Sequence, residues 1–153
     1  MKVPLVLISL ISYVLALIIL LNVVYASDNT IAIQTKGTST AISIDQSGTS
    51  NTTTVWCGLS GGAYATHSCS NATLTIDQHG TSNTARAYSQ VTNHNDNVYT
   101  INQNGNSNNA YIDLDNDDNV ASITQTGNSN YGEIYMNGDD NVYTITQTGN
   151  SFY

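Results

Sequence analysis

An eight-residue pattern, Ile-x-Gln-x-Gly-x-Ser-Asn, recurs along the chain and limits what it can fold into. Copies begin at Ile44, Ile76, Ile101 and Ile123, and a fifth begins at Ile145 but has Phe152 in place of the final Asn. The glycines of the last three copies lie 22 residues apart, and a weaker copy follows the third and fourth copies after 11 residues. A fixed period of this length is typical of repeat proteins in which each unit packs against the next.

Each half of the 22-residue unit alternates with a period of two, which predicts a β-strand. Tyr99, Ile101 and Gln103 fall on one side of such a strand, and Thr100 and Asn102 on the other. A Gly followed by Ser-Asn ends each strand, because Gly and Asn accept the left-handed backbone of a tight turn. The predicted unit is therefore strand, turn, strand, turn.

A hairpin meander would also satisfy this alternation, but identical positions at a fixed spacing favour stacking of like on like. The sequence thus predicts an all-β protein, a β-solenoid resembling a parallel β-helix, with successive laps about 4.7–4.9 Å apart. Stacked Gln side chains can pair amide to amide along a narrow core. The predicted core columns are Ile44, Ile76, Ile101, Ile123 and Ile145, beside Gln46, Gln78, Gln103, Gln125 and Gln147. The predicted turn residues are Gly48, Asn51, Gly80, Asn83, Gly105, Asn108, Gly127, Asn130 and Gly149.

The two ends of such a stack expose unpaired backbone N–H and C=O groups. The last repeat has the same sequence pattern as the interior ones and would be a template for another molecule. We therefore expect head-to-tail self-assembly into a cross-β fibre.

The first 26 residues differ from the rest: an almost wholly apolar segment, 3–24, follows Lys2 and precedes small residues at the positions a signal peptidase reads. We expect a signal peptide over residues 1–26, cleaved after Ala26, and a repeat domain over 27–153. An uncleaved membrane anchor is the alternative, because about 20 apolar residues can span a bilayer.

The charge of the chain excludes binding to nucleic acids through their phosphates. The chain has 3 basic and 11 acidic side chains, a net charge of -8. After the predicted leader only Lys36 and Arg86 are basic, whereas binding to nucleic-acid phosphates needs clustered cations.

The two cysteines, Cys57 and Cys69, lie in an insertion at about 56–70. In an exported chain such a pair predicts a disulfide. A zinc site would need two more ligands near His67, and the sequence offers none. No catalytic constellation, cofactor motif or small-molecule site is evident, so we expect no enzyme, no metal and no cofactor.

Acids gather at the predicted half-unit turns, including Asp96, Asp118, Asp139 and Asp140. We interpret them as gatekeepers that slow premature assembly. A calcium ladder is the alternative, since stacked carboxylates are suitable oxygen ligands, although the nonapeptide of calcium-binding β-rolls is absent. A broken array of outward Thr residues leaves ice binding as a minor alternative.

The runs 78–85 and 103–110 fit the pattern QxGxxNxA and resemble the repeat of curlin, the subunit of bacterial curli amyloid fibres. Gln125, Gly127 and Asn130 fit with Gly132 in place of Ala, and Gln46, Gly48 and Asn51 fit with Thr53. Asn97, Asn119 and Asn141 stand where the family repeat opens with Ser, and Leu114 and Met136 replace its second Gln.

This resemblance covers essentially the whole chain after the leader. It implies a secreted subunit that passes through the periplasm and an outer-membrane pore and forms fibres on the bacterial surface, with a role in adhesion and biofilm matrix. It also implies a second curlin-type subunit as partner. The chain would be the fibre subunit itself, or a nucleator or adhesin displayed on fibres of another subunit.

Overall fold

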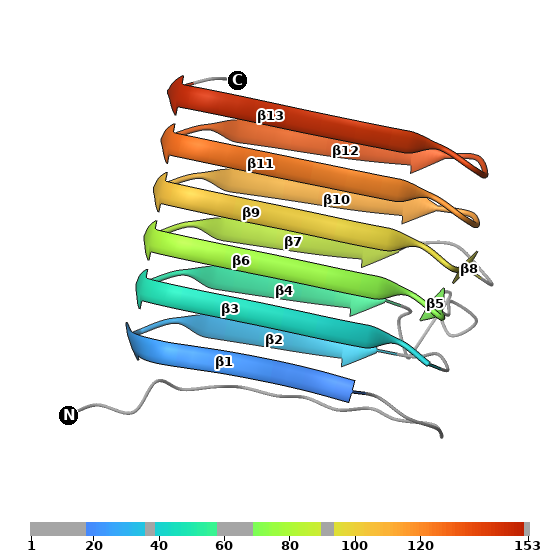
Figure 1. Cartoon of the computed structure of the whole chain (residues 1–153), viewed down its shortest axis with the longest axis horizontal. Coiled ribbons are helices and arrows are strands. Elements are labelled where there is room, and N and C mark those ends of the chain that lie inside the picture. Colours follow the sequence, from blue (N-terminus) through green and yellow to red (C-terminus); the bar gives the residue numbers. More distant parts are fainter. Residues whose placement is uncertain (1–17, 36–38, 58–68, 90–93, 152–153) are drawn as a thin grey trace, which may run out of the picture.

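The computed structural model describes residues 18–35, 39–57, 69–89 and 94–151. Two parallel sheets lie face to face, and the chain passes from one to the other at every turn (Figure 1). The first sheet contains β1 (Ile18–Ser27), β3 (Ala41–Thr49), β6 (Thr73–Thr81), β9 (Val98–Asn106), β11 (Val120–Asn128) and β13 (Val142–Asn150). The second contains β2 (Thr30–Thr35), β4 (Thr52–Cys57), β7 (Thr84–Ser89), β10 (Asn109–Asp115) and β12 (Tyr131–Asn137). The predicted all-β solenoid is confirmed.

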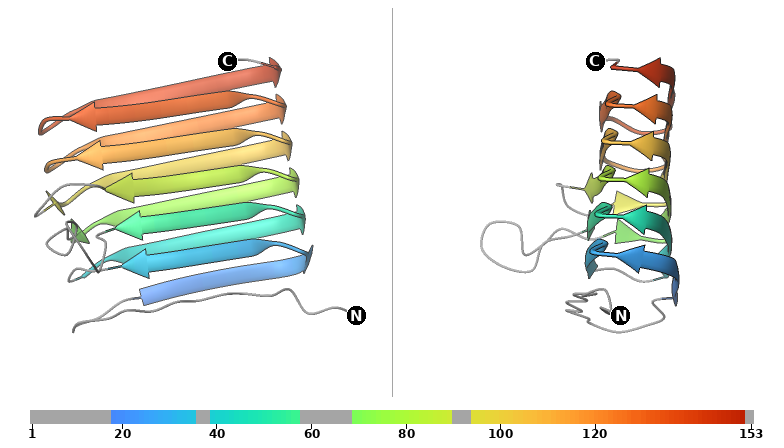
Figure 2. Two further views of the ribbon diagram at one scale, coloured as in Figure 1. Left: turned by 180° about the vertical axis from the view of Figure 1, so that it is seen from behind. Right: turned by 90° about the vertical axis from the view of Figure 1, so that its left-hand side faces the viewer.

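The two sheets lie close together, as the right-hand view of Figure 2 shows, and the laps follow the sequence repeat. Val120 pairs with Val98 below and with Val142 above, so the β9, β11 and β13 register is the 22-residue period. Larger sequence steps leave the pairing of these strands unchanged: Ile44 pairs with Ile76, and Ile76 with Ile101. The extra residues are therefore accommodated at the turns rather than within the strands. Beside these turns β5 (Cys69–Ser70) and β8 (His94–Asn95) form a small parallel pair.

The core is a thin layer of side chains between the sheets. The first sheet contributes its isoleucine column, and the second a facing apolar column of Ile33, Val55, Ala87, Ile112 and Ile134. Every second residue of β6, β9 and β11 is buried as far as the repeat glutamine, as the period-two alternation predicts. Because this apolar layer is thin, polar side chains fill the rest of the space between the sheets.

Strand β1 was not predicted. Ile18–Ser27 pairs in parallel with β3, although most of it lies in the predicted leader. The prediction of a cleaved leader remains a prediction, and residues 1–17 lie outside the described part of the chain. None of the described segments forms a helix that is both long and apolar enough to cross a membrane.

Candidate functional site

The five repeat glutamines form one continuous hydrogen-bonded column inside the solenoid. Each Nε2 donates to the Oε1 of the next lap: Gln46 to Gln78 at 2.7 Å, Gln78 to Gln103 at 2.8 Å, Gln103 to Gln125 at 2.9 Å and Gln125 to Gln147 at 2.8 Å. The direction of donation is the same at every step. The first four glutamines are completely buried. A buried amide costs free energy unless it is hydrogen-bonded, and stacking satisfies each glutamine with its own copies.

The column also ties the two sheets together. The Nε2 of Gln103 donates to the carbonyl of Thr84 at 2.9 Å, and that of Gln125 to the carbonyl of Asn109 at 3.1 Å. Thr84 and Asn109 begin strands of the opposite sheet. Each glutamine therefore stabilises its own lap as well as the contact with the next.

A column of asparagines runs along the neighbouring turn. The backbone N–H of Asn108 donates to Oδ1 of Asn83 at 3.0 Å, and that of Asn130 to Oδ1 of Asn108 at 3.0 Å. The Nδ2 of Asn108 also reaches forward to the carbonyl of Gly127 at 2.9 Å. These asparagines are buried, and equivalent bonds join Asn51 to Asn29 and Asn83 to Asn51. The column thus caps backbone groups that the turn would otherwise leave unpaired.

The turn geometry differs in one respect from the expectation. The left-handed residues are serines, Ser50, Ser82, Ser107, Ser129 and Ser151, with φ between 56° and 61°. The repeat asparagines have no positive φ and instead point inward. In this inward position the asparagine amide forms hydrogen bonds that join two laps, and serine takes the left-handed position instead.

The repeat glycines are required by the stacking distance. Gly105 has φ +134°, and a Cβ on it would lie 1.8 Å from the carbonyl oxygen of Gly127 in the next lap. Gly48, Gly80 and Gly127 meet the next glycine in the same way. Because the obstacle is backbone, no side-chain movement can relieve it.

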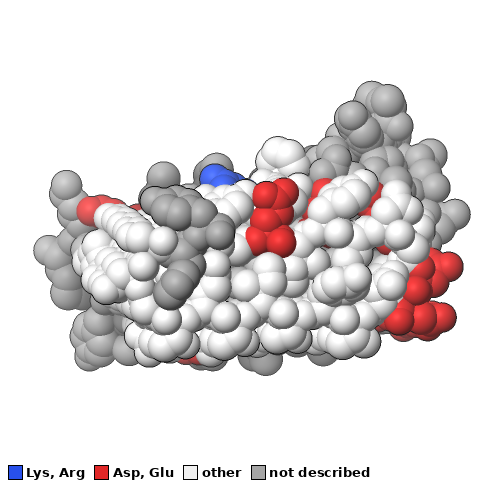
Figure 3. Space-filling view, turned by 90° about the horizontal axis from the view of Figure 1, so that it is seen from above, with Lys and Arg blue, Asp and Glu red and all other residues white. Residues whose placement is uncertain are grey.

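The acidic turns stack as their spacing suggests. Asp96, Asp118 and Asp140 hold equivalent left-handed positions, with φ of 60°, 58° and 58°. Loss of hydration, followed by repulsion from Asp140 and Asp96, raises the pKa of Asp118. On the face shown in Figure 3, one group of acidic side chains lies at one end, and further acidic side chains lie near the middle and at the other end. Within the described ranges, no group of three or more His, Cys, Asp or Glu side chains is arranged to hold a metal ion.

The insertion joins the stack through Cys69. Cys69 is buried and disulfide-bonded, and its carbonyl accepts a hydrogen bond from Thr40 at 2.7 Å. The chain's other cysteine is Cys57, whose side chain lies outside the described part, as do residues 58–68. The pairing of Cys57 with Cys69 therefore remains a prediction.

Sequence reasoning missed a group of side chains on the second sheet. Asp113 and Asp115 are 1% and 3% exposed, although the residues that precede them in β10, Ile112 and Leu114, are buried too and strict alternation would turn both carboxylates outward. The hydroxyls of Tyr111 and Tyr135 donate to these two carboxylates at 3.0 and 2.8 Å, respectively. Register alone could have placed Tyr135 beside Asp113, because the two are partners across β10 and β12.

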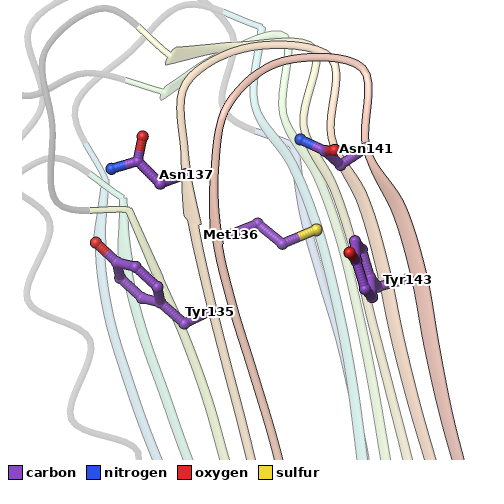
Figure 4. A pocket seen from close by; sticks show the side chains of 5 residues that line it. All are labelled: Tyr135, Met136, Asn137, Asn141 and Tyr143. Carbon is purple, nitrogen blue, oxygen red and sulfur yellow. The ribbon is translucent and has the colours of Figure 1, made fainter.

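Among the described residues, nothing pairs with the outer edge of β13. β13 is an end strand, and Val142 and Tyr143 are 71% and 58% exposed, although residues at the Tyr143 position of interior laps, such as Tyr99, are buried. Figure 4 shows Met136 pointing from β12 toward Tyr143 on β13. With Tyr135, Asn137 and Asn141 they line an open hollow of about 260 Å³.

Comparison with known proteins identifies the repeat. Residues 117–149, which include β11, β12 and most of β13, match the family model described as the curlin associated repeat. No curated protein and no solved structure matches the chain. The matched segment contains the glutamine, glycine and asparagine positions whose columns run through the remaining laps. Over this segment the chain is therefore similar to the curlin associated repeat.

Proposed function

We propose that the chain is a structural subunit of an extracellular fibre of the curli type, and that assembly is its function. One observation carries the proposal: the last strand, β13, has the side chains of an interior strand but nothing stacked on its outer edge among the described residues. An interior strand of this sheet pairs on both sides; β11, for example, lies between β9 and β13.

Addition of another lap would pair the free backbone groups of β13 and cover Val142 and Tyr143. Burial of apolar surface contributes about 25 cal/mol per Å² removed from water. Pairing of the backbone groups determines the register in which the new strand adds. A parallel edge with an interior sequence is a template for cross-β growth. The acidic turns oppose stacking within the chain, since Asp96, Asp118 and Asp140 hold equivalent positions in successive laps.

The wider role follows from the curlin repeat. The leader would export the chain into the periplasm, and an outer-membrane pore would pass it to the bacterial surface. There it would polymerise, together with a second curlin-type subunit, into fibres that serve adhesion and biofilm matrix. The repeat match and the apolar first 26 residues support this placement.

The test is assembly of the purified chain, followed by thioflavin T fluorescence and electron microscopy, with and without calcium and with and without fragmented fibres as seeds. We expect a lag phase, growth, seeding that removes the lag, and fibre diffraction with a strand repeat of about 4.7–4.8 Å. Gly105→Ala is the matched negative control, because its Cβ would lie 1.8 Å from the Gly127 carbonyl oxygen.

A stable monomer that folds only with calcium would refute the proposal and favour a calcium-dependent solenoid. A chain that does not grow alone but shortens the lag of another curlin-type subunit would be a nucleator, not the fibre subunit. Normal growth of Gly105→Ala would refute the stacked arrangement.

A further inference from the structure

An aromatic group on the second sheet continues from lap to lap. The rings of Trp56 and Tyr88 have centroids 5.3 Å apart with an interplanar angle of 62°, and those of Tyr88 and Tyr111 are 5.3 Å apart at 56°. Rings in contact typically have centroids about 4.5–7 Å apart. The three residues belong to β4, β7 and β10, which are neighbours in the sheet, so one aromatic path crosses three successive laps.

The aromatic path ends on a carboxylate. The hydroxyl of Tyr111 donates to Oδ2 of Asp113 at 3.0 Å, and Asp113 is in turn the Cα partner of Tyr88. This separation is within the range of about 2.6–3.2 Å over which a base can take a proton. Asp113 is only 1% exposed, and a buried charge costs free energy that ring packing alone would not require. The carboxylate is therefore placed as a proton acceptor for the phenol.

The other end of the path is accessible to solvent. Trp56 is 41% exposed, whereas Tyr88 and Tyr111 are only partly exposed. Indole and phenol rings both lose single electrons to strong oxidants, and a phenol is easier to oxidise when a base takes its proton in the same step. Burial raises the pKa of Tyr88, so this phenol is protonated at neutral pH and its oxidation has to release a proton.

We propose that Tyr88 and Tyr111 are a site of oxidative cross-linking, at which a peroxide-dependent oxidant joins their two rings. Each phenol loses one electron and one proton, and one hydrogen peroxide is reduced to two molecules of water. The electrons leave through Trp56, the proton of Tyr111 passes to Asp113, and that of Tyr88 passes to water. The two phenoxyl radicals form a bond between ring carbons ortho to the hydroxyls. Each coupled carbon then loses its hydrogen as a proton, and each oxygen regains one.

The link joins two strands of one chain. Tyr88 and Tyr111 lie on β7 and β10, which pair in parallel, so the new bond holds two successive laps together and adds no contact between copies. The inference therefore requires the folded laps only and does not rest on the proposed function. Because the linked laps cannot separate, the oxidised chain should dissolve more slowly in denaturant than the untreated chain.

The first arm of the test maps the link. The folded full-length chain is treated with hydrogen peroxide and a haem peroxidase, digested and analysed by tandem mass spectrometry. We expect dityrosine fluorescence, a main product joined at Tyr88 and Tyr111 with the loss of two hydrogen atoms, and migration as a monomer on denaturing gels. The same treatment in denaturant is the control for geometry, because the chain has ten tyrosines and the links of an unfolded chain should spread over many pairs.

The second arm tests the proton acceptor. Asp113→Asn retains an oxygen that accepts from the Tyr111 hydroxyl but cannot take its proton. We expect the 88–111 link to form about 10-fold more slowly or less in this variant. Tyr111→Phe retains the ring and should abolish the link.

The third arm tests the entry point. Trp56→Phe retains a ring beside Tyr88 but is much harder to oxidise, so it should slow formation of the link. Tyr135→Phe is the matched control, because the hydroxyl of Tyr135 also donates to a carboxylate, that of Asp115 at 2.8 Å, but lies outside the aromatic path. Its removal should leave the 88–111 link unchanged.

Links spread over exposed tyrosines such as Tyr135 and Tyr143 in the folded wild-type chain would overturn the inference. Equal rates for Asp113→Asn and wild type would overturn the role of the carboxylate, provided that circular dichroism shows the variant to be folded. The wild-type map decides the site whether or not a variant folds. Fibres without the link would overturn this site alone, whereas a linked chain that forms no fibre would overturn the proposed function alone.

Discussion

Replacement of Gln103 by Glu tests the glutamine column with almost no change of shape. Gln103 is fully buried; it accepts from Gln78 and donates to Gln125 and to the Thr84 carbonyl. An ionised Glu keeps the oxygen that accepts from Gln78 but places its second oxygen opposite two acceptors, Oε1 of Gln125 and the Thr84 carbonyl, at a fully buried position. We expect burial to raise the pKa of this carboxyl by about 3–5 units, as in other fully buried carboxyls.

The magnitude follows from linkage. One pKa unit corresponds to about 1.4 kcal/mol, and at pH 7 only the interval between the unfolded pKa of about 4.3 and pH 7 counts, so the loss of stability is roughly 3.5 kcal/mol for any raise of about 3–5 units. Because the folded-state pKa is raised, stability is present below the unfolded value of about 4.3 and is lost as pH rises through the folded value. Even the protonated carboxyl donates one bond fewer than the amide, a cost of about 1 kcal/mol.

The assay is the concentration of soluble chain in equilibrium with fibres between pH 3 and pH 8, for wild type and for Gln103→Glu. A loss of about 4 kcal/mol raises this concentration roughly a thousandfold at neutral pH, and acid should reverse most of the difference. Asn102→Asp is the matched control, because Asn102 is the exposed neighbour in the same strand. If Gln103→Glu behaved like Asn102→Asp at pH 7, the buried column would be refuted.

Three further outcomes are expected. Gly149→Ala should fold but add no copy beyond its own β13, because Gly149 would meet Gly48 of the next copy as Gly105 meets Gly127. Rates of seeded growth measure this effect. The control is Gly138→Ala, which has a similar φ of +135° but no stacked backbone against it and should continue to grow. Lost hydration and like charges raise the pKa of Asp118, so protonation favours the stack. Growth should therefore accelerate as pH falls through this raised pKa, and Asp118→Asn should remove part of that dependence, whereas an unchanged pH profile would contradict the repulsion. Reduction of the Cys69 disulfide should lower stability by up to roughly 3 kcal/mol, measured by denaturant titration, while fibres still form, because β5 lies outside both large sheets.

The sequence alone determined the lap, the strands and the vertical neighbours. A parallel in-register stack places residue i over its copy one period away, so the pairing of Ile101 with Ile123 and of Gln103 with Gln125 follows from the 22-residue spacing. Alternation then determined which side chains face inward in the interior strands. These features depend only on spacing along the chain, so a sequence repeat is enough to predict them.

The tertiary structure decided what depends on neighbours in space. The direction in which each amide donates, the left-handed serine, and the burial of Asp113 depend on groups from other laps or the opposite sheet, which no single repeat specifies. The same holds for the occupant of the β3 edge: periodicity predicts an open end there, but only packing reveals that β1 pairs with it and leaves Gln46 Oε1 unsatisfied. Repetition determines the interior of such a fibre subunit, whereas its ends are determined by whichever chain segment covers them.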